Sequence, residues 1–448
     1  MSDPLISAAE QSMPPAASPG EIPGDASPRR SLWHHADYLK LWLAATVSLM
    51  GSQVSQLAIP FIAAVVLNST ALEVALLGAV EMAPFILFAL PAGAWLDRVR
   101  RRPVLIAGDL GRGLALLSIP IAYALGSLTI WQLYAVGFVT GSLTVLFDVA
   151  DQSYLPVILE RADLVEGNAK LSLPQSSAQI VGPGFGGGLI GLLGAPFAVI
   201  VDAVSFFASG ALIALIRKPE PKPQRLIATD GTHTSLRQEI AEGLRHVLGN
   251  NYLRMIAGST ATSNLGTSIA FSIFPIFAYR ELGLSVALVG ALFGLGGLGV
   301  LLGAVISAPL SKKLGVGPAI VISMAINGPV TVLIFLMPSE VPVAAGLFFA
   351  SVFLTGLSAV VYNVNQVSFR QAITPLEMQG RMNATMRFVV WGTLPVGSLI
   401  GGLLASFLPL RTTIGIGAAV ATTAFLWVLL SPVRSLREIP KDEAKPTE

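Results

Sequence analysis

The fold is set by GAWLDRVRRR, residues 93–102, a basic stretch that separates two long apolar runs. The run before it, residues 73–96, and the run after it, residues 103–125, are each long enough to cross a hydrocarbon core of about 30 Å as a helix. A short basic segment between two such runs predicts a tight turn at a membrane surface. Since short loops rich in Lys and Arg stay on the cytoplasmic side, this stretch also predicts the orientation.

The composition is that of an integral membrane protein. Of the 448 residues, 53% are hydrophobic and 12% are charged, and the mean hydropathy is +0.71, whereas a soluble domain has about 25% charged residues. No cysteine is present, which excludes disulfides and cysteine-ligated metal sites. The four histidines lack metal-ligand spacing, and no phosphate-binding loop of an ATP-driven pump occurs. The sequence therefore predicts neither an enzyme nor a cofactor or metal site.

Twelve apolar runs are long enough to be membrane-spanning helices, so we predict an all-α membrane protein. The runs lie at about 40–67, 73–96, 103–125, 130–152, 168–193, 196–216, 253–278, 286–309, 318–337, 342–363, 382–408 and 411–431. Residues 1–31 are rich in proline and predict a disordered tail, because such a composition cannot bury a core. Residues 432–448 predict a second tail. The chain does not begin with a basic segment followed by a short apolar run, so we predict no cleavable signal peptide.

The distribution of basic residues predicts that both termini are cytoplasmic. With this orientation, all but three of the 28 Lys and Arg lie in cytoplasmic segments or at the adjoining helix ends. Arg280 and Arg411 would lie outside, and Arg112 would lie within a span. The opposite orientation would place nearly all the basic residues on the wrong side of the membrane.

Residues 217–252 form the only long polar segment inside the chain and divide the runs into six and six. Apolar residues recur at helical spacing within this segment, at Leu236, Ile240, Leu244 and Val247. The pattern predicts a short amphipathic helix along the inner membrane surface. A solvated linker without a helix is the alternative.

The chain is a tandem duplication. A shift of 215 residues superposes the pairs Ser48 and Ser263, Gly51 and Gly266, Pro60 and Pro275, Pro103 and Pro318, Asn168 and Asn383, Gly182 and Gly397, and Gly186 and Gly401. Because six spans separate the copies, both halves insert in the same orientation. We therefore predict two pseudo-symmetric six-helix bundles, residues 32–216 and 253–431, joined by a cytoplasmic linker.

The basic stretch also carries the motif of a known family. The loop between spans two and three of that family reads Gly-x-x-x-Asp-Arg-x-Gly-Arg-Lys/Arg. The matching residues here are Gly93, Asp97, Arg98, Arg101 and Arg102, with Arg100 at the usual glycine position. Over residues 32–432, the chain resembles the major facilitator superfamily, and in particular its enterobactin-exporter-like and macrolide-efflux-like secretion proteins. The resemblance implies a multi-pass transporter of the bacterial inner membrane with the major facilitator fold.

A second motif, in span five, resembles the antiporter motif of this superfamily. Its residues here are Gly182, Pro183, Gly186 and Gly187, and by resemblance they favour export over uptake. Glycines at 182, 184 and 187 also have the spacing of a dinucleotide-binding loop. No strand precedes them, so we expect close helix packing instead. Pro183 removes one backbone hydrogen bond and is a hinge candidate.

Asp97 is the only acid among the arginines of the basic turn. One interpretation is a helix cap at a membrane surface. By resemblance, Asp97 is instead a gate residue that pairs with Arg381 or Arg387 at the start of span eleven and holds the cytoplasmic side shut. Asp109 and Arg112, three residues apart in span three, predict an intrahelical pair. Their alternative role is to extend the charge network of the basic turn.

Acids inside the spans are candidates for proton coupling, because an ionised side chain there needs a partner or a wet cavity. Glu81 is the most central and has no cation nearby in the sequence; a hydrogen-bonded structural carboxyl is its alternative role. Asp148 and Asp151 share a face of span four, where they would attract protons or cationic substrates, or pair with the arginines of the turn. Asp202 in span six is a further proton candidate or a helix-packing hydrogen bond.

Uncharged polar residues mark the expected substrate cavity. They are Gln53 and Gln56 in span one, Gln175 and Gln179 in span five, Asn264 and Ser268 in span seven, and Trp391 in span eleven. By resemblance, spans one, four, seven and ten line a central cavity, so we expect the polar residues of spans one and seven to contact substrate first. Hydrogen bonds between helices are the alternative role.

Together these observations predict a monomeric secondary active exporter of amphipathic small organic molecules. We expect proton antiport and alternating access of the two halves, with the substrate, protons and the lipid bilayer as partners and no nucleic acid. Proton-coupled uptake of a small nutrient is the alternative. A non-transporting membrane scaffold or sensor would leave Glu81 unexplained.

Overall fold

The computed structural model describes residues 32–96, 99–160, 163–220, 236–375 and 378–437. Every regular element among them is helical, as predicted. Asp97 and Arg98 of the predicted gate and the tails at 1–31 and 438–448 lie outside the described residues.

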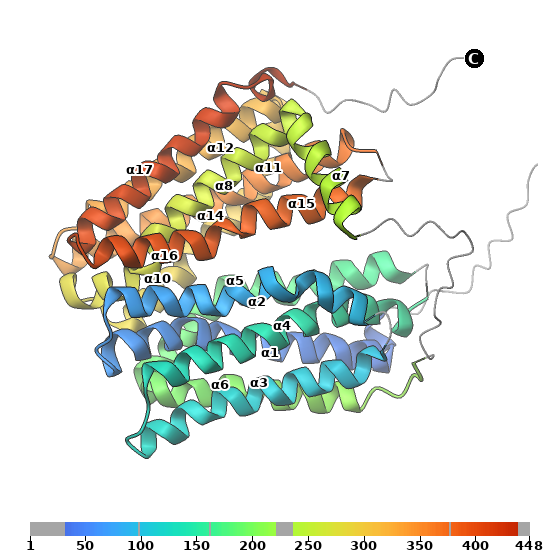
Figure 1. Ribbon diagram of the computed structural model, residues 1–448, viewed down its shortest axis with the longest axis vertical. Helices are drawn as coiled ribbons and strands as arrows, with labels where there is room; N and C mark the ends of the chain where they lie inside the picture. Colours follow the sequence, from blue (N-terminus) through green and yellow to red (C-terminus); the bar gives the residue numbers. More distant parts are fainter. Residues whose placement is uncertain (1–31, 97–98, 161–162, 221–235, 376–377, 438–448) are drawn as a thin grey trace, which may run out of the picture.

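The N-terminal half is a bundle of six long helices, the first of which is preceded by a short 3-10 helix and continued by a π-helix (Figure 1). Its elements are η1 (Leu32–His34), α1 (Ala36–Phe61), η2 (Ile62–Val66), α2 (Ala71–Leu96), α3 (Arg101–Ala124), α4 (Ile130–Ile158), α5 (Leu164–Leu193) and α6 (Ala195–Ala214).

The C-terminal half repeats this bundle with more interruptions. Its elements are α7 (Leu236–Gly249), α8 (Asn251–Ser272), α9 (Phe274–Ile276), η4 (Phe277–Glu281), α10 (Val286–Gly296), α11 (Leu298–Leu314), α12 (Val316–Val330), α13 (Val332–Phe335), α14 (Val341–Ala372), α15 (Gln379–Trp391), α16 (Thr393–Ala405), α17 (Leu410–Leu429) and η6 (Pro432–Ser435).

Eleven helical stretches of the described chain are long and apolar enough to cross a membrane. The twelfth segment of the repeat is α5, a 30-residue helix whose mean hydropathy is lowered by polar residues. It lies within the bundle beside α1 and α10. The predicted architecture of two six-helix bundles is therefore confirmed.

The duplication predicted at a shift of 215 residues is visible in the helix boundaries. Helices α3 and α12 begin at Arg101 and Val316, and α6 and α17 begin at Ala195 and Leu410. Both pairs of starting residues are separated by 215 positions. The two halves therefore present matched positions for comparison.

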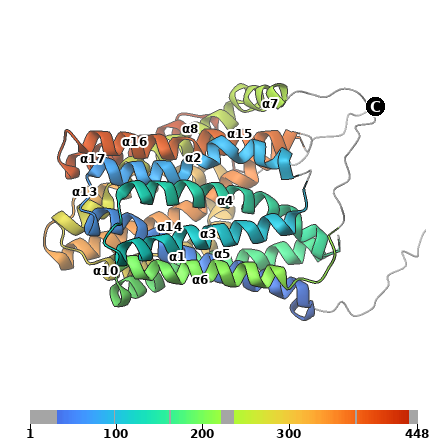
Figure 2. The same ribbon diagram turned by 60° about the horizontal axis from the view of Figure 1, so that its bottom comes forward.

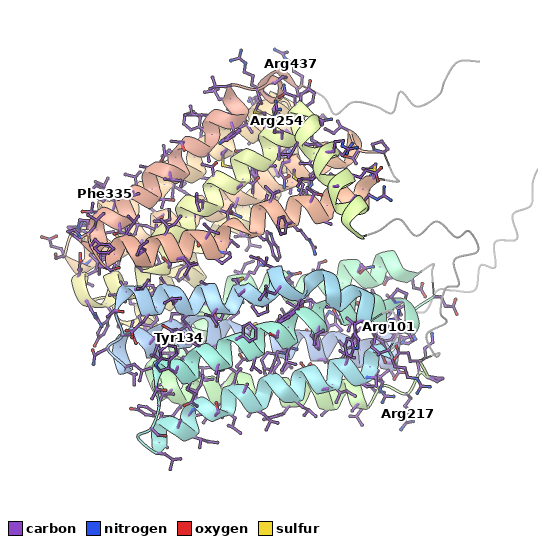
Figure 3. The ribbon with its side chains drawn as sticks, in the orientation of Figure 1. Arg101, Tyr134, Arg217, Arg254, Phe335 and Arg437 are labelled. Carbon is purple, nitrogen blue, oxygen red and sulfur yellow. The ribbon has the colours of Figure 1, made fainter. Side chains whose placement is uncertain are left out.

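One end of the molecule collects basic side chains, and we call it the basic end. Figure 3 places Arg101, Arg217, Arg254 and Arg437 toward this end and Tyr134 toward the opposite one, which we call the far end. With the predicted orientation, the basic end is cytoplasmic.

Among the described residues, the apolar cores of the two halves meet at the far end. There, Phe61 of the N-terminal half is part of the apolar core of the C-terminal half, and Val286 and Leu410 of the C-terminal half pack on the N-terminal core. At the basic end, the described core residues of each half contain none from the other half. Figures 1 and 2 show the same arrangement, with the halves in contact around α10 and α16.

Close helix contacts close the far end. A Cβ atom placed on Gly187 of α5 would lie only 2.7 Å from the Cα of Gly290 in α10, and Gly184 faces Gly294. The halves also meet where α16 contacts α2, and there Gly402 of α16 packs on α2. Small residues let membrane helices approach this closely, which is the packing role that we expected for the glycines of α5.

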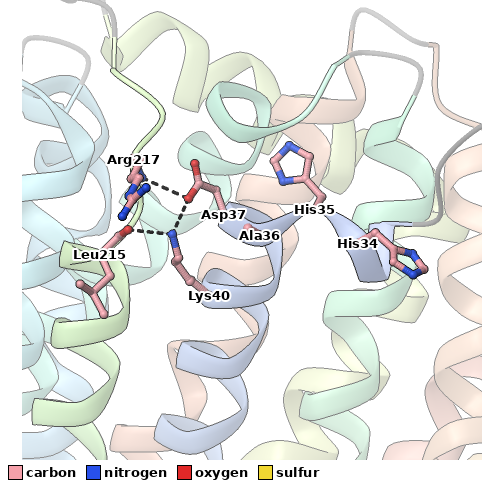
Figure 4. A pocket seen from close by; sticks show the side chains of 7 residues that line it. All are labelled: His34, His35, Ala36, Asp37, Lys40, Leu215 and Arg217. Carbon is pink, nitrogen blue, oxygen red and sulfur yellow. Dashed lines mark hydrogen bonds and ion pairs between the residues drawn. The ribbon is translucent and has the colours of Figure 1, made fainter.

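Polar contacts tie the ends of the N-terminal helices together at the basic end. The carboxylate of Asp37 accepts hydrogen bonds from the backbone N–H groups of Arg217 and Lys218, at 3.1 and 3.0 Å. Lys40 donates to Asp37 and to the carbonyl of Leu215, both at 2.8 Å (Figure 4). The start of the predicted linker is thus fixed to the N-terminal half.

An acid of the linker, Glu220, caps α3. Glu220 accepts hydrogen bonds from the backbone N–H groups of Arg101 and Arg102, at 2.7 and 3.0 Å. The Arg102 side chain donates to the carbonyls of Ile213 and Ala214 at the end of α6. Two arginines of the family motif therefore join α3, α6 and the linker, since anions suit helix N-termini and cations suit C-termini.

The predicted amphipathic helix is present as α7, and it packs against the C-terminal half. Val247 is fully buried in the core at the basic end, Gly243 lies against Thr385, and Glu242 forms an ion pair with Arg381 of α15. Arg381, one of the two gate partners proposed for Asp97, therefore has an acid from the linker beside it.

Candidate functional site

The seam between α2 and α16 ends at an aromatic pair. The rings of Phe85 in α2 and Trp391 in α15 lie 6.4 Å apart with an interplanar angle of 62°. Trp391 is the last residue of α15, where the helix breaks before α16. The guanidinium of Arg387, one turn earlier, lies 5.7 Å from the Trp391 ring. Beyond this pair, toward the basic end, the halves part.

Glu81 lies one helical turn from Phe85 at this level. It is ten residues, about 15 Å, from the start of α2 and is half-buried. Its Cγ packs on α4, 3.0 Å from where a Cβ of Gly137 would lie. The exposed apolar residues Met82 and Ile86 point to other sides of the helix. Glu81 makes no hydrogen bond or ion pair with any residue that the structure describes.

A buried charge cluster lies between α3, α4 and α6. Arg112 donates to Asp109 at 2.5 Å, and both side chains are almost fully buried. The Arg112 guanidinium is stacked between Phe147 and Phe206, at 4.3 and 4.2 Å from the ring centroids. The predicted intrahelical pair is confirmed, and the two aromatic faces add a favourable environment for the cation.

Two further acids on α4 connect this cluster with the opposite half. Asp151 lies in electrostatic range of Asp109 and Arg112. Asp148, one turn earlier, is exposed and interacts with Arg112 of its own half and with Arg387 of the other half. Both acids therefore have Arg112 as an electrostatic partner.

Asp202 is held within the N-terminal half. It is 2% exposed, and its carboxylate accepts hydrogen bonds from Ser205 at 3.2 Å and from Ser52 of α1 at 3.5 Å. Ser205 and Asp202 also fill the space beside Gly51. This is the helix-packing role considered for Asp202. Electrostatic interaction with Arg112 still links it to the cluster.

The glutamines expected to line a cavity differ in their surroundings. Gln53 packs between α1 and α5 against Gly182. Gln56, Gln175 and Gln179 are exposed. On α5, Gln179 points away from the exposed apolar side of the helix at Val181. Three of the four amides are therefore exposed.

In span seven, the expected cavity residues take the alternative role. Asn264 donates to the carbonyl of Val390 at 3.1 Å. Ser268 donates to the carbonyl of Leu394 at 2.6 Å and lies 3.0 Å from the hydroxyl of Ser398. Through these hydrogen bonds, both side chains join α8 to α15 and α16 within the C-terminal half.

The family motifs lie at helix ends and seams. Gly93 is in the last turn of α2. In α5, Gly182 contacts α1, Gly186 packs on the backbone of Val54, and Gly187 reaches the other half at α10. Pro183 lies inside α5, which continues past it without a break.

A neutral polar network in the C-terminal half was missed at the sequence level. Asn327 donates to Ser358 at 3.2 Å, and the Tyr362 hydroxyl lies 2.6 Å from that of Thr260. The repeat could have indicated both Asn327 and Tyr362, since they are the counterparts of Arg112 and Phe147 at the 215-residue shift. No group of three or more His, Asp or Glu side chains among the described residues is arranged to hold a metal ion.

Comparison with protein families gives a match to the Major Facilitator Superfamily over residues 41–389, and again over residues 256–448. Among curated proteins, the multidrug efflux pump Tap of Mycolicibacterium fortuitum is 27% identical over 356 residues, covering 77% of this chain and 84% of Tap. The MFS-type transporter YceJ of Bacillus subtilis is 23% identical over 345 residues, covering 77% and 82%.

Solved structures share the fold at low identity. A bacterial homologue of the iron transporter ferroportin in its inward-facing state has a TM-score of 0.70 at 16% identity, covering 90% of this chain and 99% of that one. Its outward-facing state gives 0.53, covering 88% and 98%. The nucleoside transporter NupG gives 0.66 at 12% identity, covering 88% and 98%.

Proposed function

Because the chain belongs to the Major Facilitator Superfamily, we propose that it is a secondary active exporter of amphipathic small organic molecules, driven by proton antiport. It works by alternating access: the two halves rock about the level of Glu81, so that one end opens as the other closes. With the basic end cytoplasmic, the arrangement described above is the state that loads substrate from the cell.

The observation that carries this proposal is the position of Glu81. An ionised carboxylate near the centre of a span costs at least about 2.5 kcal/mol, and this one has no partner among the described residues that would repay the cost. It lies at the level where the halves part and is half-buried. A carboxyl placed there binds a proton in one arrangement of the halves and releases it in the other.

Two features support export. Tap, which matches over most of its length, is a multidrug efflux pump. The glycines of α5 that resemble the antiporter motif also form the seam with α10, so this motif lies where the far end must open. An exporter uses this seam for release of its substrate.

The side chains available for substrate contact fit an amphipathic organic molecule. Phe85 and Trp391 offer aromatic faces, while Gln56, Gln175 and Gln179 offer amide donors and acceptors. A mainly apolar surface with a few placed polar groups is typical of small-molecule sites. Asp148 adds a negative charge that favours cationic members of the class.

The test is efflux from proteoliposomes carrying an imposed pH gradient, measured with a panel of fluorescent amphipathic compounds. We expect Glu81→Gln to abolish proton-driven efflux, because the amide cannot carry the proton. Glu73→Gln is the matched control: Glu73 lies on the same helix but caps its far end through Thr70, so efflux should continue.

Three outcomes would contradict the proposal. Efflux by wild-type protein that is unchanged when an uncoupler collapses the gradient would exclude proton antiport. Equal efflux by Glu81→Gln and wild type would exclude Glu81 as the carrier. Accumulation in place of efflux would show that the protein imports its substrate with protons.

A further inference from the structure

The first span of each half ends in a π-helix. These are η2 (Ile62–Val66) and η4 (Phe277–Glu281), which begin 215 residues apart. Both π-helices are followed by the same backbone hydrogen bond. Ser69 N–H donates to the carbonyl of Ala63, and Leu284 N–H donates to that of Ala278, both at 2.9 Å. π-helical turns are rare and occur frequently at functional sites.

One side chain breaks this symmetry. Arg280 in η4 has Val65 as its counterpart in η2. The Nη2 of Arg280 donates to the carbonyls of Ala64 and Ser69, both at 3.1 Å. These carbonyls belong to the other half, at the C-terminal end of a helix, where backbone acceptors lack partners and a positive charge is favoured.

The seam beside Arg280 is incompletely filled. A cavity of about 280 Å³ lies there. It is lined by side chains of both halves, including Phe61, Val65, Ile190, Tyr279 and Val286. Next to this cavity, the Arg280 hydrogen bonds form a polar link across the seam.

We propose that Arg280 is a latch that holds the far end shut, so that its release is a step of each transport cycle. The proposal rests on the alternating access proposed above. The latch is one-sided: the arginine is carried by the C-terminal half, and the carbonyls that receive it are carried by the N-terminal half. When the halves rock apart at the far end, both hydrogen bonds must break together.

Distances between spin labels in lipid nanodiscs test this proposal, and the chain offers a clean background because it has no cysteine. Cysteines at Leu125 and Phe407, which are 75% and 79% exposed in loops of opposite halves, report the far end. Cysteines at Glu160 and Gln371, also exposed and in opposite halves, report the basic end.

In the Arg280→Gln variant, the neutral amide can replace at most one of the two charge-assisted hydrogen bonds. We therefore expect the ratio of far-end-open to far-end-closed molecules to rise at least about tenfold, the effect of losing one such bond. The basic-end distance should shorten in the same molecules. Arg280→Lys keeps a positive charge near the carbonyls but lacks the planar guanidinium group. The ratio of far-end-open to far-end-closed molecules should therefore rise less than in Arg280→Gln.

Arg411 provides a matched control at the same end. It donates to the carbonyl of Phe335 at 2.9 Å and lies 5.3 Å from the ring of Phe277, so both of its contacts are within the C-terminal half. Arg411→Gln should leave the far-end distances as they are in wild type. The thermal unfolding midpoint of each variant distinguishes a shift between the far-end-open and far-end-closed states from a loss of folding.

Two results would overturn the latch: wild-type distances in folded Arg280→Gln, or an equal shift in Arg411→Gln. The spin-label distances in both variants are measured independently of the transport assay. If wild type showed no proton-driven efflux while Arg280→Gln shifted the distances, the proposed function would fail and the latch would stand. If efflux were proton-driven and the distances did not move, the latch alone would fail.

Discussion

The two halves share their helices but not their charges. At the 215-residue shift, the ionisable residues of the N-terminal site face neutral counterparts. The pairs are Glu81 and Gly296, Asp109 and Met324, Arg112 and Asn327, Asp148 and Asn363, Asp151 and Gln366, and Asp202 and Gly417. Since the same bundle forms in the second copy with neutral residues at these six positions, the fold does not require the charges at the matching positions of the first.

The C-terminal half shows how the same helices are joined without ions. Asn327 occupies the Arg112 position, and its amide bonds to Ser358 of α14 and to Ser263 of α8. Tyr362 replaces Phe147, one of the two rings against Arg112, and reaches Thr260. Neutral hydrogen bonds between membrane helices are worth about 0.6 kcal/mol each, so this half is held together with little electrostatic cost. The charges of the N-terminal half therefore call for a functional explanation.

Replacing Arg112 should have the largest effect on folding. Arg112→Ala leaves Asp109 buried without its cation, and breaking a buried pair in this way costs about 3–5 kcal/mol. Asn327→Ala, the counterpart in the neutral half, should cost about 1 kcal/mol. The free energy of unfolding in detergent measures both.

The double variant Arg112→Asn with Asp109→Asn serves as the control. It gives the N-terminal cluster the neutral character of the other half, so most of the stability lost in Arg112→Ala should return while transport does not. Equal losses in Arg112→Ala and Asn327→Ala would show that the charged and neutral halves are built alike.

The two contacts between the halves, α5 with α10 and α2 with α16, should be affected equally by matched substitutions. This contrasts with the unequal effects expected for Arg112 and Asn327. Gly187 and Gly402 are repeat counterparts, and each closes one seam of the far end: a Cβ on Gly402 would lie 2.5 Å from that of Ala75. Substitution of either by Ala should destabilise the far-end-closed state by about 1–3 kcal/mol through overpacking. Spin-label distances across the far end measure the change.

Gly188 is the matched control for this pair of variants. A Cβ at Gly188 meets no atom within 4 Å, so Gly188→Ala should behave as wild type. A shift with Gly188→Ala, or a shift at only one of the two seams, would contradict the symmetric closure.

Much of the fold followed from the sequence because its signals are local or repeated. Helical spans depend on apolar length, and the Asp109–Arg112 pair depends on a spacing within one helix. The duplication then required only a comparison of the chain with itself.

The site was less predictable, because it depends on how helices are rotated against each other. Asn264 and Ser268 were expected to face a cavity, but they lie against α15 and α16. Gln53 lies against Gly182 because the missing side chain of that glycine leaves room for it. The rings around Arg112 come from α4 and α6, which no spacing along the chain brings together.

The contact of Glu81 with Gly137 can be compared directly with its counterpart in the C-terminal half. In the N-terminal half, Glu81 packs on Gly137; at the same place in the C-terminal half, Gly296 packs on Val352. The contact between the second and fourth spans is thus conserved in volume, with the large and the small residue exchanged between the helices. The acid is therefore not needed for packing at this contact.

The smallest effect on folding is expected when this contact is exchanged. Glu81→Gly with Gly137→Val gives the N-terminal half the arrangement of the C-terminal one, and volume-conserving changes usually cost less than about 1.5 kcal/mol. Proton-driven efflux should nevertheless be abolished, since the carboxyl is gone. Gly137→Val alone, which crowds Glu81, is the control and should be the less stable protein. Efflux by the folded double variant would mean that the neutral half and the charged half are interchangeable here, and that the proton is carried elsewhere, with Asp148 the next acid to test.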